Sequence, residues 1–154
     1  MSVAFRRESD EEHLEPKFER PIPAAANLVT ARGLALIAER IAALDAALAT
    51  AAGDDAEKIR RDLRYWHTRR TTAAPTLPPA DGSAGFGTVV EVRMNGRVRR
   101  IALVGDDEAD PASDRLAYSA PLARALMAAE PGDVLPFGER EDAIMVLSVT
   151  PIDG

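Results

Sequence analysis

Apolar residues recur with a helical period in the first half of the chain. From residue 34 they follow one another at alternating steps of three and four: Leu34, Ile37, Ile41, Leu44 and Leu48. A second segment has steps of four, three and four: Ile59, Leu63, Trp66 and the aliphatic stem of Arg70. Such steps place side chains along one stripe of a helix, as in the seam of a coiled coil. The pattern therefore predicts two amphipathic helices.

The ends of these helices carry start and stop signals. Thr30 is a predicted N-cap, because its hydroxyl can accept from the free amides of a first helical turn. Gly53 predicts a left-handed turn residue, and Asp54 or Asp55 is placed to cap a second helix that should begin near Ala56. Two short amphipathic helices joined by a tight turn bury their stripes only against each other. We therefore expect an antiparallel coiled-coil hairpin over residues 28–72.

The second half of the chain changes to a period of two. Segments 87–94 and 97–104 flank Asn95-Gly96, a pair that favours a type I′ hairpin turn because both central residues need positive φ. The register of a two-residue turn pairs Val90 with Ile101 and Glu91 with Arg100. This predicts a β-hairpin with one apolar and one charged face.

Further segments complete the C-terminal half. We expect a strand at 115–119, a short helix that starts at Pro121, and strands at 134–137 and 143–149. The helix can cover one face of the resulting antiparallel sheet. The predicted fold class is α+β, with a helical hairpin followed by a sheet domain.

Proline and charge divide the chain into four parts. Residues 1–27 mix both signs of charge with three prolines and lack an apolar period, which predicts a mobile arm. Residues 73–84 are rich in proline and predict a linker that permits several angles between its neighbours. The expected domains are therefore an arm at 1–27, a hairpin at 28–72, a linker at 73–84 and a C-terminal domain at 85–154.

Composition narrows the classes of function. The 154 residues carry a net charge of -6, which argues against a protein that coats nucleic acid, because phosphate contacts need an excess of Lys and Arg. The chain has no cysteine, which excludes disulfides and thiolate metal sites and fits a reducing cytoplasm. No export signal and no long apolar run is visible. We expect a soluble cytoplasmic protein.

Five local strings, taken in order, resemble the GreA/GreB transcription elongation factor family. They are Asn-Leu-Val-Thr-Ala-Arg-Gly-Leu at 27–34, Phe-Gly at 86–87, Val-Gly-Asp-Asp-Glu-Ala-Asp at 104–110, Ser-Ala-Pro-Leu-Ala-Arg-Ala-Leu at 119–126 and Gly-Asp-Val at 132–134. The resemblance implies an FKBP-like C-terminal domain that docks on the rim of the secondary channel of bacterial RNA polymerase. Prolyl isomerase activity does not follow from this fold, because function depends on the site.

The resemblance also suggests docking residues in the C-terminal domain. They lie in an acidic loop and in a strand-to-helix turn: Asp106, Asp107, Glu108, Asp110, Ser119, Pro121, Leu122 and Arg124. The alternative for the turn is an ordinary connection without a binding role, and the family's usual Ser before the Pro is Ala120 here. The acidic loop lacks the glycine and terminal Glu of a calcium-binding loop, so we expect no metal there.

The tip of the hairpin carries the acidic residues Asp54, Asp55 and Glu57. In cleavage-competent family members, tip acids help to hold a magnesium ion in the polymerase active centre, because this ion prefers oxygen ligands. The simpler interpretation here is helix capping. A first helix of roughly 22 residues extends only about 33 Å. The tip motif of the family, an acidic residue followed shortly by Glu-Asn, is also missing here. The short hairpin resembles that of a family relative with a truncated coiled coil, the regulator of nucleoside diphosphate kinase.

A basic stretch follows in the second helix: Arg60, Arg61, Arg64, Arg69 and Arg70. In the family a basic hairpin surface lies near RNA and polymerase, which suggests contact with RNA or DNA in the elongation complex. The alternative is a solvated helix face with pairs such as Glu57 and Arg61. The two histidines, His13 and His67, lie in different segments and support neither a metal pair nor a catalytic relay.

These observations predict a monomeric, non-enzymatic regulator of transcription elongation that binds core RNA polymerase and needs no cofactor. A factor that stimulates transcript cleavage through Asp54 and Asp55 is the first alternative, and an adaptor for another protein is the second. The direction of the effect on transcription and the role of the arm stay open.

Overall fold

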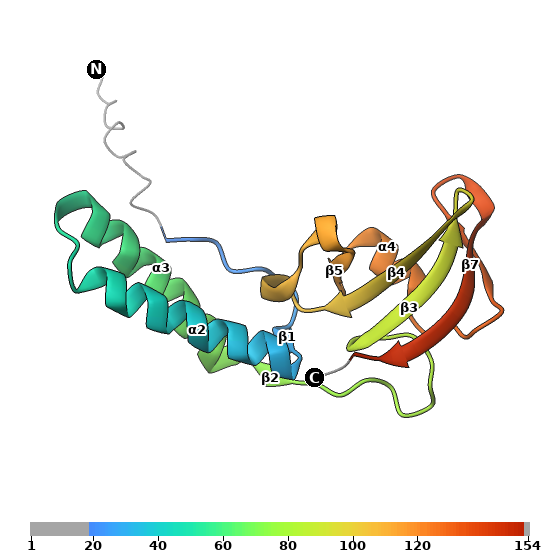
Figure 1. Cartoon of the computed structure of the whole chain (residues 1–154), viewed down its shortest axis with the longest axis horizontal. Helices are drawn as coiled ribbons and strands as arrows, with labels where there is room; N and C mark the ends of the chain where they lie inside the picture. The colour runs from blue at the N-terminus through green and yellow to red at the C-terminus, as the bar shows by residue number, and fades with distance from the viewer. Residues whose placement is uncertain (1–18, 153–154) are drawn as a thin grey trace, which may run out of the picture.

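The computed structural model describes residues 19–152, and the predicted arm lies mostly outside this range. A helical hairpin occupies one end of the molecule and a curled β-sheet the other (Figure 1). The predicted α+β class is therefore confirmed. Within the described residues, no helix combines the length and the apolar character that a membrane crossing requires.

The hairpin consists of α2 (Ala31–Leu48) and α3 (Gly53–Thr72), which lie side by side in Figure 1. The predicted cap is present, since Thr30 Oγ1 accepts a hydrogen bond from the Gly33 amide at 3.0 Å. The predicted stripes meet in one cluster whose buried members include Ile37, Ile41, Leu63 and Trp66. Burial of these side chains stabilises two helices that would be marginal in isolation.

Three details of the hairpin differ from the prediction. Helix α2 has 18 residues rather than about 22. Gly53, with φ +60, opens α3 instead of closing α2, and α3 has no side-chain cap, so neither Asp54 nor Asp55 caps it. The buried arginine is Arg69 and not Arg70. Both positions lie near the apolar stripe, and Arg69 is the one that faces a carboxylate of the sheet domain.

The sheet has five strands in the order β5-β4-β3-β7-β6. Their bounds are β3 Thr88–Met94, β4 Arg97–Val104, β5 Arg115–Ala117, β6 Val134–Phe137 and β7 Arg140–Pro151. The predicted register of the first hairpin is confirmed, with Val90 opposite Ile101 and Glu91 opposite Arg100. Asn95 and Gly96 both have positive φ, as the two-residue turn requires.

The sheet is mixed rather than antiparallel, because β5 runs parallel to β4. After β4 the chain forms the 3-10 turns η2 (Asp106–Glu108) and η3 (Pro111–Ser113), which carry it back along the edge before β5 begins. The Arg99 guanidinium pairs with Asp114 at 2.7 Å and fixes this return. A prediction from alternating residues could not detect it, since the period of two is the same in both pairings.

Helix α4 (Pro121–Leu126) covers one face of the sheet and completes the larger core. It lies behind the strands in the view of Figure 1. Val90, Ile101, Ile144 and Leu126 are fully buried in this core. The opposite face of the sheet carries no helix in the described part of the chain.

Two short strands tie the hairpin to the segment that follows it. Strand β1 (Leu28–Val29) pairs in parallel with β2 (Ala74–Pro75), at the start of the predicted linker. The end of that segment is held by the sheet domain, since Ala84 exchanges two backbone hydrogen bonds of 2.8 Å with Ala128 and Ala129. The segment between the two domains is thus anchored at both ends.

Candidate functional site

The turn η2, which follows β4, lies against the hairpin. Its Glu108 is buried and accepts a hydrogen bond from the Thr30 hydroxyl at 2.6 Å. Arg32 and Arg115 also direct guanidinium groups at the Glu108 carboxylate. Thr30 therefore has two roles, because the oxygen that caps α2 also donates to a carboxylate of the sheet domain. The start of α2 is fixed to the end of β4.

Asp107 forms a second buried connection between the two domains. Its carboxylate accepts from the Tyr65 hydroxyl and from Arg69 Nε, each at 2.5 Å. Arg69 Nη2 in turn donates to Asn27 Oδ1 at 2.8 Å, and Asn27 Nδ2 donates to the Arg69 carbonyl at 2.7 Å. We call Asn27, Tyr65, Arg69 and Asp107 the clasp. Burial, followed by the hydrogen bond to Asp107, raises the pKa of Tyr65 to about 12.

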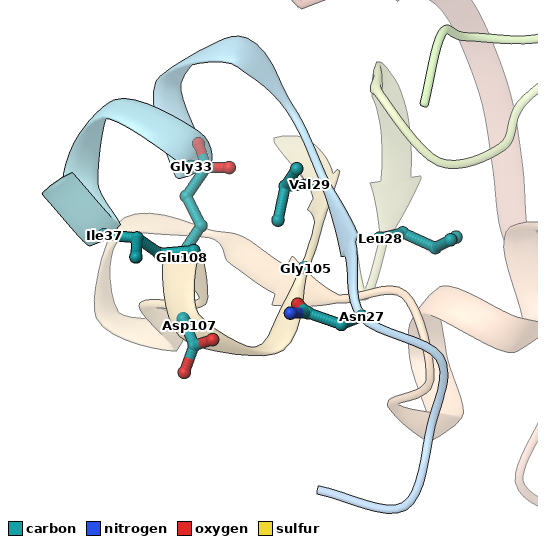
Figure 2. A pocket seen from close by; sticks show the side chains of 8 residues that line it. All are labelled: Asn27, Leu28, Val29, Gly33, Ile37, Gly105, Asp107 and Glu108. Atoms are coloured by element: carbon teal, nitrogen blue, oxygen red, sulfur yellow. The ribbon is translucent and has the colours of Figure 1, made fainter. Parts of the chain in front are cut away.

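The junction is closely packed, and Figure 2 shows the residues that line the small cavity in it. The cavity between Asn27, Gly33, Gly105 and Glu108 has a volume of about 10 Å³. One water molecule needs at least about 10 to 15 Å³ on this measure, so no ligand fits. A side chain at Gly105 would collide with the Leu28 carbonyl oxygen. The junction therefore holds the domains together and is not a ligand pocket.

The acidic loop is divided between the interior and the surface. Asp107 and Glu108, two of the predicted docking residues, point into the junction and are engaged there. Asp110 is exposed and accepts from the Ser113 hydroxyl at 2.9 Å, while Asp106 is half-buried. Of the four acids in this loop, only these two are placed to face a partner.

The strand-to-helix turn keeps its predicted residues at the surface. Ser119, Pro121 and Arg124 are exposed, and Leu122 is half-buried at the start of α4. The turn is supported by Tyr118, whose hydroxyl donates to the Ala26 carbonyl at 2.7 Å. Ser119 Oγ lies 3.5 Å from Asp106 Oδ1, so the surface acid of the loop and this turn form one area.

The three tip acids lie at the far end of the hairpin. Asp54, Asp55 and Glu57 are all exposed in the first turns of α3. Glu57 pairs with Arg60 at 3.6 Å instead of with Arg61. Within residues 19–152, no three His, Asp or Glu side chains converge as ligands of one metal ion.

Only part of the predicted basic stretch lies on the surface. Arg60, Arg64 and Arg70 are exposed and Arg61 is half-buried, whereas Arg69 is 1% exposed and belongs to the clasp. Arg64 is paired with Glu19 at 2.7 Å, and its hydrogen bonds lower the pKa of that carboxyl. Arg69 is therefore removed from the candidate nucleic-acid surface.

Sequence patterns did not single out Asn27 or Tyr65 for the junction. Asn27 precedes a strand of two residues, and Tyr65 lies next to a stripe position without belonging to the stripe. Both are separated from their partners by about forty residues, with a separation of 42 for each. The only local signal for the junction was a polar side chain, that of Tyr65, next to the predicted apolar stripe.

Comparison with known proteins gives a family match for the C-terminal half of the chain. Residues 79–151 match the family described as Transcription elongation factor, GreA/GreB, C-term. The transcription elongation factor GreB of Neisseria meningitidis serogroup A is 38% identical over 99 residues, which is 60% of each chain. GreA of Ralstonia nicotianae is 38% identical over 82 residues, or 47% of this chain and 52% of that protein. The chain thus spans 60% or less of the length of these relatives.

Solved structures give a weaker likeness. The GreA factor homolog 1 (Gfh1) protein of Thermus thermophilus is 17% identical, with 79% of this chain and 97% of that chain covered and a TM-score of 0.38. A GreA/GreB factor from Nitrosomonas europaea is 19% identical, with 80% and 96% covered and a TM-score of 0.37. The family assignment therefore rests on the sequence matches. Residues 79–151 therefore match the C-terminal domain of the GreA/GreB family, and the sequence matches together support that family for this chain.

Proposed function

We propose that the chain is a monomeric transcription elongation regulator that binds bacterial RNA polymerase in the cytoplasm. The relatives that match it are named transcription elongation factors, which supports polymerase as the partner. The C-terminal domain docks through the exposed turn at Ser119, Pro121 and Arg124, together with Asp106 and Asp110. The hairpin then enters the secondary channel, and the chain catalyses no reaction of its own.

The length of the hairpin supports the second part of the proposal, which concerns transcript cleavage. Helices of 18 and 20 residues extend about 27 to 30 Å at a rise of about 1.5 Å per residue. The two buried connections at the base prevent the hairpin from gaining reach by sliding away from the sheet domain. Such a hairpin occupies the entrance of the channel and leaves Asp54 and Asp55 short of the active centre. We therefore expect regulation without efficient stimulation of transcript cleavage.

The docking turn is tested with Arg124→Glu. Arg124 is exposed and has no ion-pair partner among the described residues, so reversal of its charge leaves the fold intact. Loss of a contact at the docking surface should weaken binding to purified core polymerase about tenfold. Arg140→Glu is the control, because Arg140 is also exposed in the same domain but lies at the start of β7, away from the docking turn, where its ion pair with Asp142 is itself exposed. Wild-type protein that fails to bind polymerase at micromolar concentration removes the proposed function.

A transcript-cleavage factor remains the second candidate, because Asp54 and Asp55 are exposed at the tip and neither caps a helix. Backtracked elongation complexes incubated with magnesium distinguish the two. We expect the wild-type protein to release short 3′ RNA fragments no faster than polymerase alone. Release that is faster and that disappears in the Asp54→Asn, Asp55→Asn double variant would establish the second candidate instead.

A further inference from the structure

The outer face of the sheet, opposite α4, carries a row of exposed side chains across four neighbouring strands. Arg93 on β3 lies between Val98 on β4 and Met145 on β7, and Met145 is paired in turn with Val134 on β6. Val98 is 52% exposed, Met145 41% and Val134 51%. We call these four residues the outer-face row.

The row is unusual for a sheet face that has no covering layer. Such a face normally carries polar side chains, with the apolar ones turned to the core. Six large hydrophobic side chains are exposed in the described part of the chain, and three of them belong to this one row. Because strands are spaced about 4.8 Å apart, the four side chains span about 14 Å. Apolar side chains gathered on one exposed sheet face favour contact with another macromolecule.

The charge of the row favours an acidic partner. Among residues 19–152, no carboxylate lies within ion-pair distance of the Arg93 guanidinium. The neighbouring Arg100 has only Glu91, at 3.8 Å and in an exposed pair that contributes little. On β3 and β4 this face therefore carries two arginines and one carboxylate, in a chain of net charge -6. A second copy of the chain facing it would place one Arg93 near another, whereas an acidic partner complements it.

We infer that the outer-face row binds an acidic segment of RNA polymerase, whose carboxylate pairs with Arg93 while its apolar side chains cover Val98, Met145 and Val134. The inference rests on the proposed function and adds a second contact to it. The row ends on β6, the strand against which α4 packs. The docking turn instead follows β5, the strand at the opposite edge of the sheet. A polymerase segment at the docking turn and one on the outer face thus hold the C-terminal domain at two separate places.

The absence of cysteine from the chain allows a direct test. A benzophenone maleimide is attached to the full-length Met145→Cys variant, which is then mixed with purified core polymerase and illuminated. We expect a crosslink to a polymerase peptide with Asp or Glu within a few residues of the attachment point. Arg93→Glu in the same background should lower the crosslink yield about fivefold or more, and Arg140→Glu should leave it unchanged.

A second label, at Ser119→Cys, separates the two proposals. If Ser119→Cys crosslinks polymerase while Met145→Cys does not, or while Met145→Cys crosslinks equally with Arg93→Glu, the outer-face contact is wrong and the proposed function stands. If neither label reaches polymerase, both proposals fail. A Met145→Cys crosslink to a second copy, or within the same chain, also overturns the inference.

Discussion

Arg69→Ala is expected to lower the free energy of unfolding by about 3 to 5 kcal/mol, because it removes one partner of a buried ion pair. The Arg69 side chain is 1% exposed, and its loss leaves the Asp107 carboxylate with the Tyr65 hydroxyl alone. Asn27 loses the donor to its side-chain oxygen at the same time. The remaining groups stay buried with unmet hydrogen bonds, which is the costly outcome.

The neighbouring Arg70 provides a matched control. It is exposed, and its guanidinium group lies 3.1 Å from the His67 ring. Arg70→Ala removes the same charge and the same number of atoms, yet should change stability by less than about 0.5 kcal/mol. Urea denaturation monitored by the fluorescence of Trp66, the single tryptophan, measures both variants. Equal losses of stability in the two variants would show that the clasp stabilises the fold no more than an exposed ion pair does.

A double variant separates the burial of charge from the loss of packing. Arg69→Met with Asp107→Leu removes both charges and keeps apolar volume in the junction. Replacement of a whole buried pair by apolar side chains is often close to neutral. We therefore expect the double variant to be more stable than Arg69→Ala. The free energy of unfolding that the double variant still lacks, compared with the wild type, measures what the hydrogen bonds of the clasp contribute in addition to packing.

The elements of each half follow from local rules, whereas the joining of the halves does not. The Thr30 cap, the stripes at Ile37 and Leu63, and the turn at Asn95 each depend on residues only a few positions apart. Periodicity and turn chemistry detect such features because they record which side of the local backbone is buried. The β-hairpin register could be predicted to the residue for the same reason.

The junction depends on pairs that are far apart in sequence. Glu108 meets Thr30 across 78 residues, and Asp107 meets Arg69 across 38. Both acids follow a strand in a polar loop, where solvent exposure is the ordinary expectation for a carboxylate. Only the approach of the hairpin turns them inward, and an ion pair then makes their burial tolerable. For this reason a proline-rich segment that suggests a loose linker connects domains that are in fact fixed.

Gly105→Ala tests that fixed geometry through the backbone alone. Gly105 has an ordinary φ of -80, so alanine adds no conformational strain there. Its new methyl group would instead meet the Leu28 carbonyl oxygen of β1, which is backbone and cannot rotate away. Strand β1 must therefore move. We expect a loss of about 3 kcal/mol in the free energy of unfolding, at the upper end of what overpacking costs.

Gly138→Ala is the control for this prediction, because Gly138 has φ +65 but open space around it. Its cost should be about 1 to 2 kcal/mol, from the left-handed backbone alone. Spin labels on cysteines introduced at the exposed Ala47 and Thr150 report the distance between the hairpin and the sheet. Gly105→Ala should shift or broaden that distance distribution, and Gly138→Ala should not. An unchanged distribution in both, with equal losses of stability, would mean that β1 does not set the position of the hairpin relative to the sheet.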